Sequence, residues 1–167
     1  MSKPIRWLGQ GLLYTLFALI IGSFSHWPRY RHLAADEAEV RLSFSHEGKR
    51  ESACRQRSPE ELAKLAPNMR APLDCPRRRS PVTVAVDVDG RPAIRRVAKP
   101  SGLSGDGAST VYQRLVLPAG EHRLAVRLRD DIRSAGFDYQ REESVTLKPG
   151  QVLVIDFNAE KGGITLQ

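Results

Sequence analysis

Residues 82–90 read VTVAVDVDG, a stretch in which valine occupies every second position and an Asp-Gly pair follows. Successive side chains of a β-strand point to opposite faces, so this alternation predicts a strand over residues 82–88 with one buried face. Asp-Gly favours the tight turn of a hairpin, and residues 91–97 are expected to form the returning strand. Asp87 and Asp89 also have the spacing of a calcium loop. Its other ligands and its bidentate Glu are absent, so the sequence predicts a turn.

The same alternation recurs along the chain and predicts a mainly β fold. Further strands are expected at residues 40–44, 110–117, 123–129 and 152–157, with another strand or bulged pair over residues 137–147. About seven short strands separated by turn residues are typical of an antiparallel β-sandwich, which we assign to residues 38–167. One short helix is inserted after Ser58, because Ser-Pro-Glu-Glu provides an N-cap, a proline at the first helical position and a glutamate at the third.

Residues 7–24, WLGQGLLYTLFALIIGSF, form an uncharged segment ahead of this domain. As a helix they would extend about 27 Å, close to the thickness of the hydrocarbon layer of a bilayer. Trp7 is the first residue of the segment, and Trp27 and Tyr30 follow its end. These aromatic side chains therefore suit the two membrane interfaces. The segment therefore predicts a transmembrane helix, with residues 1–6 as a cytoplasmic tail and residues 25–37 as a juxtamembrane stalk. The alternative is a cleaved secretory signal, for which Ser23-Phe24-Ser25 is the best cleavage site.

Charge and cysteine content bear on compartment and partners. Basic residues are nearly balanced on the two sides of the apolar segment, so they do not decide its orientation. The formal charge of the chain is +7, but from Asp36 onward there are 22 basic and 19 acidic residues, without a nucleic-acid-binding motif. The near-balance of the domain disfavours a nucleic-acid partner, whereas the four basic residues before Asp36, with no acidic residue among them, suit a membrane surface.

Cys54 and Cys75 are the only cysteines. Two cysteines in a loop-rich stretch are typical of a structural disulfide in an oxidising compartment, which would stabilise the fold by about 3 kcal/mol through loop closure. We therefore expect the domain to lie in the periplasm, anchored in a bacterial inner membrane. The alternative is a Cu(I) or thiol-handling site formed by Cys54, Cys75 and Met69, because thiolate and thioether ligands favour Cu(I). No cofactor is expected under the first interpretation.

Arginine is the commonest basic residue, and six arginines are candidates for a docking face. They are Arg77, Arg78, Arg79, Arg123, Arg127 and Arg129. Arginine binds carboxylates and phosphates in a bidentate manner, so such a face suits anionic lipid, phosphate or an acidic protein surface. The alternative is a polar face that only keeps the domain soluble.

Catalytic motifs are not apparent in the sequence. It contains neither a G-x-S-x-G nucleophile elbow nor an HExxH helix, and His122 has no evident partner for general-base chemistry. The acidic pairs at 130–131 and 142–143 would point to opposite faces of a strand. The sequence therefore predicts a non-enzymatic protein.

Residues 118–126, PAGEHRLAV, resemble the turn and strand of immunoglobulin-like or transthyretin-like extracytoplasmic domains with a P-x-G-x-H pattern. This resemblance implies the type of β-sandwich and nothing about ligands. The layout of an N-terminal anchor followed by a small β domain is similar to that of single-pass accessory proteins of bacterial respiratory oxidases. It implies a binding or accessory role, as a subunit or assembly factor of a respiratory membrane complex, and transfers no site residues.

Overall fold

A computed structural model of the chain describes residues 3–27 and 32–167. It divides the chain into two compact units, Met1–Ala34 and Ala35–Gln167. Tyr30, which the sequence places at a membrane interface, lies outside the described residues.

The first unit consists of one helix, α1, Lys3–His26. It is longer at both ends than residues 7–24, and its length and apolar composition are sufficient to cross a membrane. None of its residues, all of which are described, is buried. Trp7 lies in the second turn of the helix and Trp27 follows its last residue, and both side chains are exposed.

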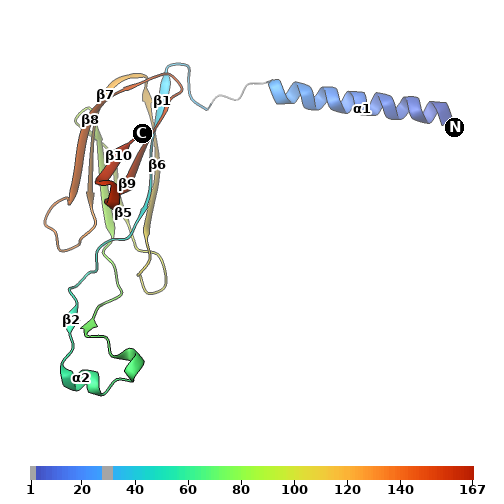
Figure 1. Ribbon diagram of the computed structural model, residues 1–167. Helices are drawn as coiled ribbons and strands as arrows, with labels where there is room; N and C mark the ends of the chain where they lie inside the picture. The colour runs from blue at the N-terminus through green and yellow to red at the C-terminus, as the bar shows by residue number, and fades with distance from the viewer. Residues whose placement is uncertain (1–2, 28–31) are drawn as a thin grey trace. The chain divides into compact units, whose positions relative to one another are not determined.

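The second unit is mainly β and contains two four-stranded sheets (Figure 1). One sheet has the strand order β10-β9-β1-β6 and the other β5-β4-β7-β8. The strands are β1 Glu37–His46, β4 Val82–Val88, β5 Arg91–Ala98, β6 Ser109–Pro118, β7 Gly120–Arg129, β8 Tyr139–Leu147, β9 Val152–Asn158 and β10 Gly163–Leu166.

The hairpin predicted from VTVAVDVDG is confirmed. β4 and β5 pair in antiparallel register, and the turn residues Asp89 and Gly90 have φ angles of 52° and 76°. Positive φ at both central positions is the geometry of the two-residue turn that matches strand twist. Val82, Val84, Val86 and Val88 are all buried, as the alternation requires.

The core fills the space between the two sheets. Most of its members alternate along their strands with exposed or half-buried residues, so a period of two explains most of the core; Glu39 of β1 and Ala85 of β4 are buried on the opposite face. Besides the four valines of β4, the buried set includes Ala38, Val40, Leu42, Phe44, Leu124, Val126, Leu128, Leu153, Ile155 and Phe157.

The sandwich is not wholly antiparallel, which corrects the sequence-based expectation. β9 pairs in parallel with β1, from Glu39 opposite Val152 to Leu42 opposite Ile155. The chain passes from β8 in one sheet to β9 in the other, at the end where β1 begins. β9 therefore runs in the same direction as β1. The two sheets also contain eight strands in place of about seven, because β10 was not predicted.

Between β1 and β4 the chain makes an excursion, residues 51–79, that we call the arm. It contains the short strands β2 (Arg55–Gln56) and β3 (Leu73–Asp74), the helix α2 (Pro59–Ala63) and the 3₁₀ turn η1 (Pro67–Met69). The cap at Ser58 is confirmed, with reciprocal hydrogen bonds between Ser58 and Glu61. All residues of the arm are described, and none of them is buried. Figure 1 shows β2 and α2 away from the two sheets.

Candidate functional site

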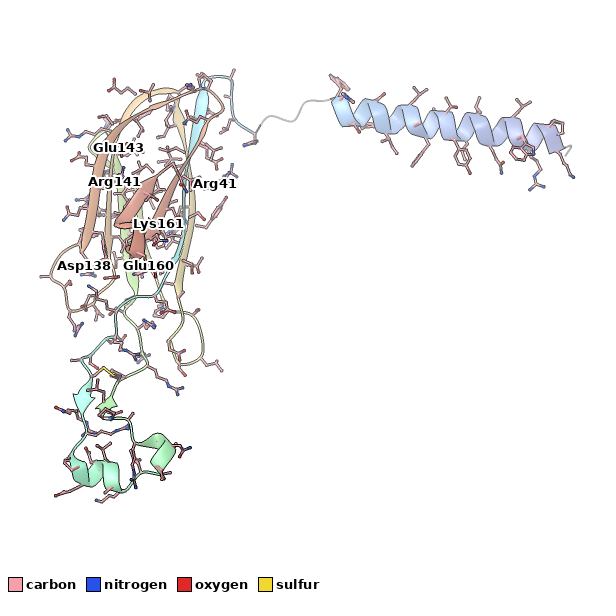
Figure 2. The ribbon with its side chains drawn as sticks, viewed as in Figure 1. Arg41, Asp138, Arg141, Glu143, Glu160 and Lys161 are labelled. Atoms are coloured by element: carbon pink, nitrogen blue, oxygen red, sulfur yellow. A yellow bond between two sulfur atoms is a disulfide. The ribbon has the colours of Figure 1, made fainter. Side chains whose placement is uncertain are left out.

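The two cysteines lie at the base of the arm. Their sulfur atoms are 2.09 Å apart, at the distance of a disulfide bond, and they close the loop that carries α2 and η1. Figure 2 shows this bond in yellow. A bonded pair offers no thiolate to a metal, so binding of Cu(I) would require the reduced form. Within residues 3–27 and 32–167, no group of three or more His, Cys, Asp or Glu side chains could hold a metal ion.

Polar interactions, with no apolar core, hold the arm together. Arg55 forms ion pairs with Glu61 at 2.9 Å and with Asp74 at 3.2 Å, which links α2 to β3. Arg57 contacts the same Asp74 at 3.1 Å. The backbone N–H of Ser58 and then the guanidinium of Arg55 lower the pKa of Glu61 below its ordinary value. The arm is thus an ordered loop fastened by a cap, a two-residue ladder, ion pairs and a disulfide.

Residues 64–73 of the arm include exposed apolar and exposed cationic side chains. Met69 is 62% exposed and Leu73 is 53% exposed. Nearby in sequence, Lys64 and Arg70 are exposed and form no ion pair with any carboxylate of the described residues. The Arg70 side chain donates a hydrogen bond to the carbonyl of Leu65 at 3.0 Å, which fixes the base of its guanidinium.

The distribution of charge within the β domain is uneven. The arm contains seven basic and four acidic residues. Residues 36–50 and 80–167, which form the sandwich and its loops, contain fifteen of each. The positive surplus of the domain therefore lies entirely on the arm.

The six candidate docking arginines do not share one face. Arg77, Arg78 and Arg79 follow Cys75 at the end of the arm, whereas the other three lie along β7. In the β4–β7 register Thr83 is opposite Arg129 and Val88 is opposite Leu124, so Arg123 lies near the end of β4 that is farther from the arm.

Several of these arginines are neutralised by neighbours. Arg123 pairs with Glu142 of β8 at 2.6 Å, and Arg127 pairs with Asp87 of β4. The guanidinium of Arg127 also lies over the Phe137 ring, 5.4 Å from its centroid, in a cation–π contact. Arg79 pairs with Glu47 at 2.6 Å, and Arg78 lies 4.0 Å from Glu51. Within residues 3–27 and 32–167, neither Arg77 nor Arg129 forms an ion pair.

A buried carboxylate on β1 was not identified from the sequence. The Glu39 side chain is fully buried and pairs with Arg41 at 2.7 Å and with Arg114 of β6. The hydrogen bond from Arg114 is the main cause that lowers the pKa of Glu39 to about 2. Glu and Arg two residues apart lie on the same face of a strand, and this spacing was the available signal. Both arginines belong to the domain's own network, so this group stabilises the sheet.

A serine, a histidine and an aspartate meet at the other end of β1, but not as a catalytic triad. His46 Nε2 is 2.8 Å from Asp130 Oδ2, and the imidazole packs edge-on against Phe157. Ser109 lies opposite His46 in the β1–β6 register, and its side chain is fully buried. Its hydroxyl has no hydrogen-bond partner among the described residues and therefore no bond to the imidazole. A nucleophile needs both that bond and access for substrate.

His122 has a partner that sequence reasoning missed. Its Nδ1 is 2.8 Å from Asp89 of the β4–β5 turn, and its Nε2 is 2.9 Å from the carbonyl of Pro118. Hydrogen bonding to Asp89, and secondly to Pro118, raises the pKa of His122 above its ordinary value. With both ring nitrogens engaged, the imidazole joins two turns and is not available as a general base.

Comparison with models of known families, with curated proteins and with solved structures found no match for this chain. The functional conclusion therefore depends on the sequence and on the geometry above.

Proposed function

We propose that this chain is a non-enzymatic, single-pass membrane protein of the bacterial inner membrane. Its β domain lies in the periplasm and binds a larger membrane assembly, in the specific form of a subunit or assembly factor of a respiratory complex. The observation that carries the proposal is α1, a helix of 24 residues in which residues 7–24 are uncharged and mostly apolar and none is buried. A bilayer supplies the apolar surroundings that such a helix requires.

The periplasmic side is supported by the sulfur atoms of Cys54 and Cys75, which lie at bonding distance. Disulfides persist in oxidising compartments and are rare in the cytosol. The two sheets and the PAGEHRLAV strand support an immunoglobulin-like or transthyretin-like domain, a type common outside the cytoplasm.

A binding role is supported by the way the polar groups of the sandwich are used. Glu39 and Asp87 are held by arginines, and His46 and His122 by aspartates. Side chains engaged in this way stabilise the domain and are not free to act in acid–base or nucleophilic chemistry. The arm, in contrast, presents unsatisfied charge and apolar surface to the outside.

Two measurements on the full chain test the proposal. Carboxyl-terminal fusions to alkaline phosphatase and to a cytosolic fluorescent reporter should give phosphatase activity and no fluorescence. Native gel electrophoresis after mild detergent extraction and crosslinking should show the protein in a species heavier than its monomer. Fluorescence in the cytosol, a mature protein that begins after Ser25, or a monomer with no crosslinked partner would each contradict it.

A second candidate function is copper or thiol handling in the periplasm through Cys54, Cys75 and Met69. It is favoured by the exposure of Cys54 and Met69 to solvent, which would allow a reductant or a metal donor to reach the loop. Mass spectrometry of protein isolated from membranes separates the two functions. An intact disulfide supports the structural role, whereas free thiols with stoichiometric Cu(I) support handling.

A further inference from the structure

We propose that the arm is the docking element of this protein, and that its partner is an acidic, extracytoplasmic surface of a membrane protein. The tip formed by Lys64, Met69 and Arg70 makes the contact, with the cations on carboxylates and the methionine in an apolar depression. The inference rests on the proposed function and adds to it the binding element and the chemistry of the partner.

Charge complementarity is the first support. The sandwich is neutral in formal charge, whereas the arm has three more basic than acidic residues. Cations that are already paired, such as Arg123 and Arg127 on β7, offer little to a partner. Lys64 and Arg70 have no carboxylate partner in the described parts of the chain, so an acidic surface can engage them without breaking an existing ion pair.

Exposed apolar side chains close in sequence to these cations are the second support. Met69 lies directly before Arg70 in the 3₁₀ turn, and more than half of its surface is open to solvent. Leu73 is exposed on the same return segment. Methionine adapts its shape to irregular apolar surfaces, and an apolar anchor surrounded by polar groups is the usual anatomy of a binding hot spot.

Pre-organisation is the third support. A 29-residue excursion without buried residues would ordinarily be a disordered loop. Here the Cys54–Cys75 bond, the Ser58 cap and the ion pairs of Arg55 hold it in one conformation. A pre-formed binding element loses less conformational entropy when it associates.

The arm leaves the sandwich far from the point at which the chain enters it. The chain enters the sandwich at Glu37, and the arm follows His46 at the other end of β1. Ten residues of strand separate the two points, or about 30 Å. The arm and the entry of the chain thus lie at opposite ends of the sandwich.

Site-specific photo-crosslinking tests the proposal in native membranes with the full chain. A diazirine amino acid is placed at position 69, first in the otherwise natural sequence, then with Lys64→Glu and Arg70→Glu. The matched control carries Lys148→Glu and Lys161→Glu, which reverse two exposed lysines of the sandwich and change the net charge equally. Hydrogen exchange of β4 and β7 checks that all three proteins are folded.

We expect one discrete membrane protein to be crosslinked, with a yield that falls about tenfold in the arm double variant. The control should keep its yield, and reversal of a contacted carboxylate on the crosslinked protein should restore binding to the arm variant. Equal losses in both double variants, an unchanged yield in the arm variant, or crosslinks to lipid alone would each overturn the proposal.

The outcome also separates this inference from the proposed function. If the arm variant still migrates in the native complex although the crosslink is lost or absent, the accessory role remains and the arm is not the docking element. If the natural sequence migrates as a monomer, the proposed function itself fails.

Discussion

Removal of the Cys54–Cys75 bond tests whether the arm and the sandwich unfold independently of each other. In the variant with Cys54→Ser and Cys75→Ser, the constraint on a loop with ends 21 residues apart is lost. The chain-entropy relation gives about 3 kcal/mol for a loop of this length, provided that the native conformation of the loop persists. This value is an upper limit for the decrease in the free energy of unfolding of the whole domain.

The measured decrease should be smaller than this limit, because the arm has no buried residue of its own. Once the bond is removed, the Ser58 cap and the ion pairs of Arg55 and Arg57 are its main remaining support. Exposed ion pairs contribute between 0 and about 1 kcal/mol each, and a cap contributes about 1 kcal/mol. The arm should therefore unfold locally in the variant. The free energy of unfolding of the whole domain then decreases only by the small folding free energy of the arm itself.

Hydrogen exchange followed by mass spectrometry, together with urea unfolding, measures both quantities. Amides of residues 55–74 should exchange at the rate of an unfolded chain in the variant, whereas those of β4 and β7 should keep their protection. A variant with Ser52→Ala, an exposed residue of the arm, serves as control. If the arm amides stay protected, or if protection in β4 and β7 is lost together with them, the arm is not an independent, core-free element.

Three further predictions concern the sandwich. Glu39→Gln removes the charge that its two arginine partners share and should lower the free energy of unfolding by about 2 kcal/mol. Because the pKa of Glu39 falls from 4.5 to about 2 on folding, its contribution is present above pH 4.5 and is lost as the pH falls toward 2, so acid titration of the variant should lack that loss. His122 has a raised pKa, so the stability that it provides is complete below its unfolded pKa near 6.5 and disappears as the pH rises through the folded value. His122→Asn should remove this decrease in urea unfolding measured at increasing pH from 6.5 upward, and an unchanged profile would show that the pair with Asp89 does not act on folding. A Cβ at Gly48 would lie 2.1 Å from the carbonyl oxygen of Ser80, so Gly48→Ala should destabilise the domain by about 1–3 kcal/mol, measured by thermal unfolding.

Local sequence patterns were sufficient wherever one segment determines its own structure. The alternation of valines in residues 82–88 and the Asp-Gly pair that follows specify a strand with one buried face and a two-residue turn. The Ser-Pro-Glu-Glu sequence from Ser58 specifies the start of α2 in the same way. The parallel pairing of β9 with β1 has no such signal, because it depends on which sheet the chain enters after β8. The partner of His122 was missed for a similar reason, since Asp89 is 33 residues away along the chain.

The arginines show most clearly why a functional surface cannot be predicted from residue type alone. On β7, antiparallel pairing brings Asp87 and Glu142 from the neighbouring strands next to Arg127 and Arg123, so the face has mixed charge. On the arm there is no adjoining sheet to supply carboxylates to Lys64 and Arg70. The effect of a cation on binding depends on what already neutralises it. A docking function is therefore better placed on the arm than on the arginine-rich strand that the sequence first suggests.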